Sequence, residues 1–363
     1  MVIRVLIVDD SAFMRRLLTE MIKGFPGFEV AGIAKNGAEA VEQVNMLKPD
    51  VVTLDVEMPI MDGLQALNEI MRTYPTPVVM VSSLTQEGAD ATIQALLLGA
   101  VDFIGKPTGS ISLELVQKQE ELQAKLKAAA SSRRSVRKWG VESPSATTVS
   151  KPAVTKAPRL PSRQGSKSIT SICAIGTSTG GPKALETVIR SLPEELDVPI
   201  VIVQHMPAKF TASLAQRLNQ LSKVHVMEAS HHQRLEPGCV YIAPGGKHME
   251  IIAAGMSDFR IMIQEQNAVN GHRPSVEVMF DSVTRLKGLH KTYVIMTGMG
   301  ADGAKAMQRA KQSNPLAVTV GEAESTCIVY GMPRAAAELK CVDHVLPLQQ
   351  ISRKLLDIFS SNR

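Results

Sequence analysis

The sequence has few cysteines, no paired cysteine motif and no long apolar run. The four cysteines of the 363-residue chain lie far apart, and no two of them form a C-x-x-C pair. This spacing gives no support to a zinc site or a dithiol redox motif, and the apolar surroundings of the cysteines predict buried, reduced thiols. No apolar run reaches the roughly 18 to 20 residues of a membrane helix, and the N-terminus lacks a signal-peptide pattern. We therefore expect a cytoplasmic protein that is not inserted in a membrane.

The sequence also lacks a nucleic-acid-reading motif, although its net charge is +5. Residues 131–168 contain nine basic residues and one acidic residue, so this segment alone carries +8 and the remainder is near −3. The segment is rich in Ser, Pro and Ala and cannot form a core, which is typical of a flexible linker. Because no helix-turn-helix, zinc-finger or basic-aromatic pattern accompanies it, we expect no nucleic-acid partner.

Alternating apolar runs and amphipathic segments flank the linker on both sides. In the first region five apolar runs alternate with helical patterns, which predicts an α/β domain with a doubly wound, five-stranded parallel sheet. The alternation resumes at Ile169 and predicts a second, Rossmann-like α/β domain whose sheet has a mixed edge. We expect the first domain at 1–120, a helical extension and flexible basic linker at 121–168, and the second domain at 169–363.

Polar residues follow the strands of the first region. They are two carboxylates after the first strand, one after the third, a hydroxyl after the fourth and an ammonium after the fifth: Asp9, Asp10, Asp55, Ser82 and Lys106. The ends of parallel strands share one edge of a sheet, where a hard cation such as Mg²⁺ would relieve the repulsion between the carboxylates. A carboxylate there can attack a phosphoryl group while cations neutralise the developing charge. Each residue alone could be a helix cap, a turn residue or a surface charge, but together they predict a phosphoryl-transfer site.

This pattern resembles the receiver domain of two-component response regulators over about residues 3–120. The resemblance implies that Asp55 accepts a phosphoryl group from a histidine kinase and that Ser82 and Lys106 bind this group. It places Phe103 at the position of the family's switch aromatic. The residues that it implies around Mg²⁺ are Asp9, Asp10, Asp55 and Glu57, the last through its carbonyl.

In the second region, the stretch G-T-S-T-G places Ser178 between an apolar strand and a helix. The spacing fits the G-x-S-x-G elbow of nucleophilic serines, and Pro182 suits the first turn of the helix. The N–H groups at that helix start could stabilise an oxyanion or bind phosphate. Pro182 interrupts the G-K-[ST] step of a P-loop, so that match is only partial. From this stretch alone a nucleophile, a plain turn and a phosphate loop all stay open.

A nucleophilic serine needs a base, and one histidine lies at the expected sheet edge. His205 ends the apolar run after Ser178 and precedes Met206 and Pro207. Asp302 follows another apolar run and could orient the imidazole, with an N-cap of the next helix as its structural alternative. The chain order Ser, His, Asp differs from that of α/β-hydrolases, whereas the logic of a triad does not depend on order.

At these residues nearly the whole chain resembles the chemotaxis response regulators that are protein-glutamate methylesterases and glutamine deamidases. The matching motifs are I-G-T-S-T-G-G-P, Q-H-M-P, A-P-G-G-K-H-M, H-R-P-S-V, T-G-M-G-A-D-G and Y-G-M-P. The resemblance implies a phosphorylation-activated serine hydrolase with Ser178, His205 and Asp302 as its triad. Its substrates would be glutamate γ-methyl esters of chemoreceptors, with release of methanol, and specific receptor glutamines. It implies no cofactor for hydrolysis, and we expect a monomer.

Further residues could bind the oxyanion or the substrate: Thr179, Gly180, Met299, His272 and Arg273. Two departures from the family pattern are visible. Glu277 stands where an aspartate is expected, and residues 321–324 replace a Gln-Asp-Glu-type stretch. Both departures could alter the fit of the substrate.

Two functions of other classes compete with the hydrolase. The first is a phospho-switched adaptor with an idle hydrolase fold, against which the intact Ser178, His205 and Asp302 argue. The second is a DNA-binding response regulator, which lacks support because no DNA-reading motif is present. The sequence leaves open the receptors, the kinase and the preference between ester and amide. Our hypothesis for regulation is that the unphosphorylated first domain covers the Ser178 crevice.

Overall fold

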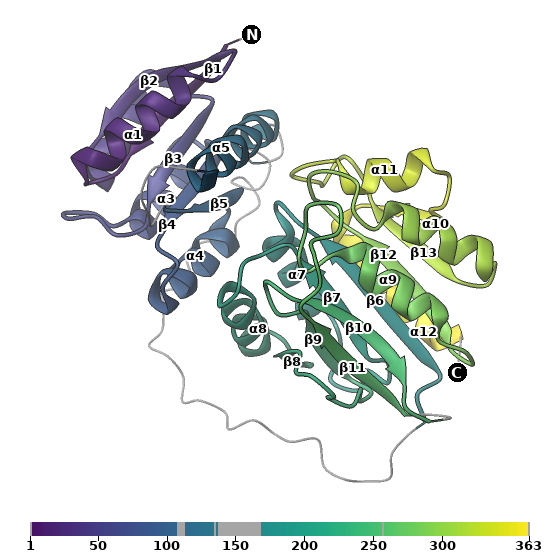
Figure 1. The fold of residues 1–363 in the computed structure, drawn as a ribbon. Helices are drawn as coiled ribbons and strands as arrows, with labels where there is room; N and C mark the ends of the chain where they lie inside the picture. Colours follow the sequence, from purple (N-terminus) through teal and green to yellow (C-terminus); the bar gives the residue numbers. More distant parts are fainter. Residues whose placement is uncertain (1, 107–112, 134–135, 137–167, 256–257, 362–363) are drawn as a thin grey trace.

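The computed structural model describes residues 2–106, 113–133, 136, 168–255 and 258–361, without the side chains of 113–117. The proposed linker therefore lies mostly outside the described residues. Two α/β units precede and follow it, coloured purple to blue and teal to yellow in Figure 1.

The first unit has a five-stranded parallel sheet in the order β2-β1-β3-β4-β5. Its strands are β1 (Ile3–Val8), β2 (Phe28–Ala34), β3 (Val51–Asp55), β4 (Val78–Ser82) and β5 (Asp102–Gly105). Its helices are α1 (Ala12–Lys23), α2 (Gly37–Leu47), α3 (Gly63–Thr73), α4 (Gln86–Leu98) and α5 (Leu113–Ser131).

Helices cover both faces of this sheet, as its nearly continuous apolar strands predict. Successive residues of a strand point to opposite faces, so Leu6 packs with α2, α3 and α4 whereas Val5 packs with α1 and α5. The buried Leu122 and Leu126 form the inner face of α5. The predicted doubly wound parallel fold is confirmed.

The second unit is built on a seven-stranded sheet in the order β14-β13-β12-β6-β7-β9-β8. Its strands are β6 (Ser171–Thr177), β7 (Ile200–Gln204), β8 (His225–Glu228), β9 (Cys239–Ile242), β12 (His290–Ile295), β13 (Val318–Glu322) and β14 (His344–Leu346). Its helices are α7 (Gly181–Arg190), α8 (Phe210–Leu221), α9 (Val276–Arg285), α10 (Ala304–Ser313), α11 (Met332–Glu338) and α12 (Leu348–Ser361).

The expected mixed edge of this sheet is wrong. All of its strand pairs are parallel. The antiparallel strands β10 (His248–Ala253) and β11 (Phe259–Gln264) pair with each other in a separate two-stranded sheet. They pack with α9 on one face of the large sheet, because Met249 and Ile261 belong to the same buried cluster as Phe280.

The strand order places a topological switch point at the end of β6. Strand β7 lies on one side of β6 and β12 on the other, so the chain leaves β6 at a point where the strand order reverses. Ligands of open α/β sheets bind at such switch points, outside the carboxyl ends of the strands. Ser178 directly follows β6 and therefore lies at this point.

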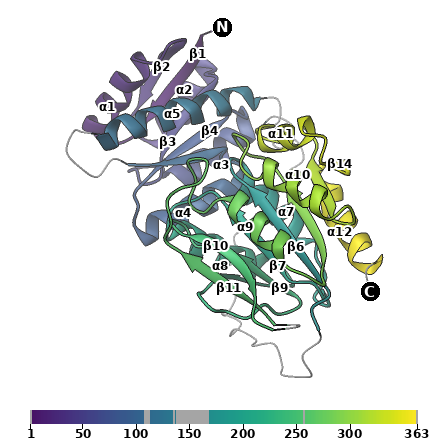
Figure 2. The ribbon, with the colours of Figure 1, turned by 45° about the vertical axis from the view of Figure 1, so that its right-hand side comes forward.

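The two units are in direct contact. Helix α4 packs against α7 and α8, and Figure 2 shows the same arrangement from a second direction. Phe103 of β5 stacks on Phe210 at the start of α8, with 4.4 Å between ring centroids and 16° between planes.

Two predictions from composition can be compared with the structure. The four cysteines are buried and none forms a disulfide in the described structure, as their apolar surroundings predict. Among the residues that the structure describes, no helix combines the length and the apolar character needed to cross a membrane.

Candidate functional site

The elbow that carries Ser178 is fixed by the backbone around it. The Ser178 N–H donates to the Thr297 carbonyl at 3.0 Å, and the Ser178 carbonyl accepts from the Gly181 N–H at 2.8 Å. The Gln204 side chain donates to the same carbonyl at 3.0 Å. Gly180 has φ +78°, and a Cβ on it would lie 2.7 Å from Ile328. The sharp turn therefore needs glycine there, and it leaves Ser178 half-buried at the start of α7.

His205 and Asp302 meet at the same sheet edge. His205 Nε2 lies 2.9 Å from Asp302 Oδ2, and the His205 N–H donates to the carbonyl of Thr177, the last residue of β6. Among the described residues, the buried His205 Nδ1 has no hydrogen-bond partner. Because Asp302 engages Nε2, Nδ1 is the ring nitrogen that remains open to another partner.

The Asp302 carboxylate accepts hydrogen bonds from several directions. Its oxygens accept from Asn270 Nδ2 at 2.9 Å, Ser275 Oγ at 2.9 Å and the Val276 N–H at 2.6 Å. Burial alone would raise the pKa of Asp302, but the hydrogen bonds from His205, Asn270 and Ser275 outweigh it and lower this pKa to about 2. The carboxylate is therefore ionised and fixed in orientation.

The structural alternative for Asp302, an N-cap of the following helix, is wrong. The N-cap position of α10 is Gly303. Asp302 instead accepts from the first N–H groups of α9, those of Val276 and Glu277. A carboxylate at a helix N-terminus is stabilised by the helix dipole. The dipole of α9, a helix distant in sequence from Asp302, therefore helps to keep the pKa of Asp302 low.

The predicted substrate-side residues occupy different surroundings. The His272 ring stacks on the His205 ring, with 3.8 Å between centroids and 8° between planes. Burial, followed by the nearby His205, lowers the pKa of His272 to about 4. Arg273 is exposed and donates to the Gln266 carbonyl, while Met299 is half-buried in its loop.

The first unit contacts the elbow itself. The Gly180 N–H donates to the Val101 carbonyl at 3.2 Å, and Thr179 Oγ1 donates to Asp102 Oδ2 at 2.5 Å. Lys125 of α5 pairs with Asp102 at 3.4 Å. Two of the predicted oxyanion residues, Thr179 and Gly180, are thus engaged by the first unit.

The acidic residues of the first unit lie together as predicted. Asp9, Asp10 and Asp55 each offer an oxygen within 4.8 Å of the others. Lys106 Nζ lies 2.7 Å from Asp55 Oδ2 and 3.7 Å from Asp9 Oδ2. Burial raises the pKa of Asp55 to about 6 against the lowering effect of Lys106, and nearby Asp9 adds to the rise.

Two other residues predicted for this site are arranged differently. The Ser82 hydroxyl accepts from Thr92 Oγ1 and lies 3.1 Å from both the Gly88 and the Ser83 carbonyls, so its described partners are in α4 and in the turn before it. Glu57 lies two residues after Asp55 and its side chain is exposed. Its predicted contact with a cation uses the main-chain carbonyl and not the side chain. Phosphoryl binding by Ser82 stays a prediction.

Reasoning from the sequence missed the residues that support the candidate triad. Thr297 holds the Ser178 backbone, Gln204 holds the elbow, and Asn270 and Ser275 hold Asp302. The sequence did offer a signal for three of these supporting residues, because motifs already singled out contain Thr297, Gln204 and Ser275. Glu277, one of the two departures, bonds Asn270 and pairs with Arg309 at 2.7 Å.

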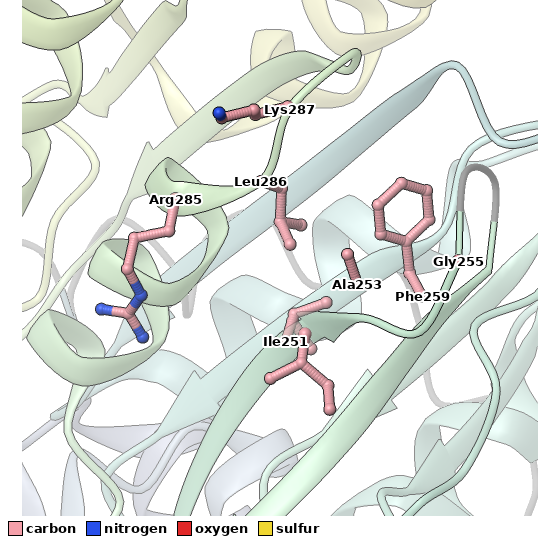
Figure 3. Close-up of a pocket in the computed structure, with 8 residues that line it drawn as sticks. Ile251, Ala253, Gly255, Phe259, Arg285, Leu286 and Lys287 are labelled. Carbon is pink, nitrogen blue, oxygen red and sulfur yellow. The ribbon is translucent and has the colours of Figure 1, made fainter.

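A separate hollow lies between the β10–β11 hairpin and the end of α9 (Figure 3). It has a volume of about 420 Å³. Ile251, Phe259 and Leu286 form apolar walls, and Arg285 and Lys287 add two cationic side chains. None of the predicted site residues lines it.

Fold and geometry together define a class of two-domain protein. One α/β domain carries a cluster of carboxylates at the ends of its strands, and the second α/β domain carries Ser178, His205 and Asp302 after its strands. The family model described as CheB methylesterase matches residues 173–355, and that of the response regulator receiver domain matches residues 5–117. The chain belongs to the family of protein-glutamate methylesterases/protein-glutamine glutaminases.

Relatives and a solved structure extend this similarity. The chain is 45% identical to the protein-glutamate methylesterase/protein-glutamine glutaminase of Halalkalibacterium halodurans, over 98% of this chain and 97% of the relative. For the enzyme of that name from Symbiobacterium thermophilum the identity is 47%, over 96% and 95%. The crystal structure of the Thermotoga maritima CheB methylesterase catalytic domain is 38% identical, with TM-score 0.50, over 52% of this chain and 98% of that structure.

Proposed function

We propose that this protein is a phosphorylation-regulated hydrolase that removes methyl groups from glutamate γ-methyl esters of chemoreceptors and deamidates specific receptor glutamines. The observation that carries the proposal is the His205–Asp302 hydrogen bond at the sheet edge where the Ser178 elbow ends β6. The names of its full-length relatives supply the substrate class.

The mechanism is acyl transfer through Ser178. Ser178 Oγ attacks the ester carbonyl while His205 Nδ1 accepts its proton, and Asp302 stabilises the imidazolium that forms. The C–O bond to the methoxy group then breaks, and His205 returns the proton to the departing methanol. Water, deprotonated by His205, then attacks the acyl-serine. The bond between the acyl carbon and Ser178 Oγ breaks, His205 returns the proton to Oγ, and a free glutamate is released. A glutamine loses ammonia by the same route.

The oxyanion of each tetrahedral intermediate needs backbone donors. Thr179, Gly180 and Met299 are the proposed donors because they flank Ser178 or lie in the loop between Thr297 and Asp302. Stacked on His205, His272 forms one wall of the site and stays neutral because burial lowers its pKa to about 4. Arg273 is proposed to contact the substrate from the exposed rim.

The first domain acts as the receiver. A divalent cation fits its acidic cluster, because three carboxylates converge and the buried Asp9 Oδ2 has no hydrogen-bond partner among the described residues. Asp9, Asp10, Asp55 and the Glu57 carbonyl would hold Mg²⁺, which would neutralise charge on a phosphoryl group. Asp55 accepts that group from a histidine kinase, and Lys106 and Ser82 bind its oxygens.

Regulation follows from the contact between the domains. The Val101 carbonyl occupies the Gly180 N–H, and Asp102 occupies the Thr179 hydroxyl. A substrate carbonyl cannot use the Gly180 donor while Val101 is bonded to it. We propose that this is the resting state and that phosphorylation of Asp55 shifts the domains apart.

The protein acts as a monomer in the cytoplasm, without a nucleic-acid partner.

Methanol release from methylated receptor cytoplasmic fragments tests the function. The full chain should release methanol, and a small phosphodonor should raise the rate. Asp55→Asn, which cannot be phosphorylated at this position, should keep the resting rate and lose the response to the donor. Equal stimulation of wild type and Asp55→Asn would rule out Asp55 as the phosphoacceptor, and no release under any condition would rule out the esterase.

Asp102→Ala should raise the resting rate of methanol release about fivefold to tenfold, because one buried hydrogen bond of about 1 to 1.4 kcal/mol between the domains is lost. The phosphorylated rate should stay within about twofold, since that state no longer uses the bond. Glu121→Ala is the matched control: it removes another acidic partner of Lys125 but leaves the Asp102–Thr179 bond in place. A resting rate that does not change in Asp102→Ala would argue against this contact as an inhibitory one.

A further inference from the structure

A second carboxylate lies beneath the candidate active site and has no role in the mechanism above. Glu322, the last residue of β13, is wholly buried. Its Oε2 accepts from the Thr297 N–H at 2.8 Å, and its Oε1 accepts from the Thr326 hydroxyl at 3.0 Å. Thr326 Oγ1 in turn accepts from the Leu348 N–H at 3.1 Å. The carboxylate therefore joins the loop after β12 to the turn after β13.

Thr297, the partner of Glu322, clamps the backbone on both sides of the proposed nucleophile. Its carbonyl accepts from the Ser178 N–H at 3.0 Å. Its hydroxyl donates to the Thr179 carbonyl at 3.0 Å and accepts from the Val329 N–H at 3.0 Å. Thr297 also begins the loop that carries Met299 and Asp302, so its position influences both the elbow and the acid.

A buried acidic side chain is costly unless its hydrogen bonds are satisfied. Burial raises the pKa of Glu322 to about 7, although the Thr297 N–H and the Thr326 hydroxyl act to lower it. The titratable group that faces it among the described residues is the Cys327 thiol, whose own pKa burial raises well above its usual range. Cys327 therefore stays neutral, and the partners of the carboxylate are hydrogen-bond donors.

We propose that Glu322 is a positioning residue for hydrolysis at Ser178. Its side-chain oxygen fixes the Thr297 N–H, and Thr297 fixes the main chain on either side of Ser178. The inference rests on the proposed function for its effect on rate, whereas the link from Glu322 through Thr297 to the elbow is a property of the fold. Glu322 contacts neither substrate nor reacting atoms in this scheme.

Substitutions can separate this role from simple support of β13. Glu322→Gln retains a carbonyl oxygen for the Thr297 N–H, and its amide can donate to the Thr326 hydroxyl. Glu322→Met fills a similar volume but leaves the Thr297 N–H buried without a strong acceptor. Thr326→Val removes the other partner of the carboxylate and leaves the bond to Thr297 intact, so it is the matched control.

The test compares these variants in the full chain with phosphodonor present, by methanol release. For Glu322→Met we expect kcat to fall about 10-fold to 100-fold, the effect of leaving one buried donor unpaired, with KM within about twofold. Glu322→Gln and Thr326→Val should stay within about threefold of wild type. Amide hydrogen exchange gives a second readout: exchange at Thr297 and Ser178 should accelerate in Glu322→Met and not in Glu322→Gln.

The two readouts keep the inference separate from the proposed function. If wild type releases no methanol, the esterase fails, and hydrogen exchange still decides whether Glu322 holds the elbow. If kcat and exchange in Glu322→Met equal those of wild type, or if Glu322→Gln is impaired as strongly as Glu322→Met, the positioning role is overturned. Should Glu322→Met not fold, Glu322→Ala, with its smaller side chain, takes its place under the same criteria.

Discussion

Ser178→Ala should reduce methanol release by about 10⁴-fold to 10⁶-fold, as expected when a nucleophile that acts together with its base is removed. Without Oγ no acyl-enzyme can form, and His205 has no hydroxyl to deprotonate. The fold should persist, because the described bonds of Ser178 to Thr297, Gly181 and Gln204 use only its backbone. A low residual rate is expected, since the proposed oxyanion donors remain.

The measurement for Ser178→Ala is methanol release with phosphodonor present, accompanied by thermal unfolding. Ser191→Ala is the matched control, because Ser191 follows α7 and its exposed hydroxyl bonds only the Thr187 carbonyl in the described structure. Ser191→Ala should leave the rate unchanged. A Ser178→Ala protein that keeps more than about one tenth of the wild-type rate would contradict the nucleophile and favour the plain-turn interpretation of the elbow.

Asp302→Asn should lower kcat by about 10⁴-fold, because the amide selects the wrong tautomer of the base. Asp302 Oδ2 faces His205 Nε2; in the proposed mechanism it keeps the ring proton there, so that Nδ1 accepts the proton from Ser178. The Val276 N–H donates to the same oxygen at 2.6 Å. If the oxygen of the introduced amide keeps that bond, its NH₂ meets Asn270 and Ser275, and in the flipped orientation the NH₂ faces His205. The flipped orientation is the one that selects the wrong tautomer of His205, whereas the other orientation keeps the tautomer but sets the amide NH₂ against the Asn270 donor.

Comparison across pH makes the Asp302 test specific. Burial acts to raise the pKa of Asp302, but its hydrogen bonds outweigh burial and lower this pKa to about 2, so the wild-type carboxylate keeps its charge at every pH above that value. No pH from about 4 to 9 should therefore bring wild type down to the rate of Asp302→Asn. The control is Asp281→Asn, which removes a carboxylate that pairs with Arg309. A loss of rate of less than about tenfold in Asp302→Asn would argue against the triad.

Strand ends explain why much of the fold and of the candidate site could be predicted. In a parallel sheet, a residue that follows a strand must lie at the carboxyl edge. Asp9, Asp55 and Lys106 therefore converge, and so do His205 and Asp302. Apolar runs predicted all the strands of the first sheet and, in the large sheet, all but the short β8 and β14. The two family models match residues 5–117 and 173–355.

Other features depend on tertiary contacts that no local pattern encodes. The expected mixed edge is wrong because β10 and β11 pair with each other, and the alternation of apolar runs does not specify which strands pair. The alternative role of Asp302 as the N-cap of the adjacent helix is wrong, because its carboxylate instead accepts from the start of α9, which is distant in sequence but close in space. The His205–His272 stack and the buried Glu322 contact likewise depend on packing between distant elements.

The bond between the Val101 carbonyl and the Gly180 N–H joins two backbone atoms, which has a consequence for how the two domains can diverge. Side-chain substitutions at position 101 that preserve the local strand leave the carbonyl in place. An alanine scan of the interface would report only the side-chain contacts and would underestimate the coupling between the domains. Side chains on the surface of the first domain can therefore change over evolutionary time while this backbone contact between the domains is kept.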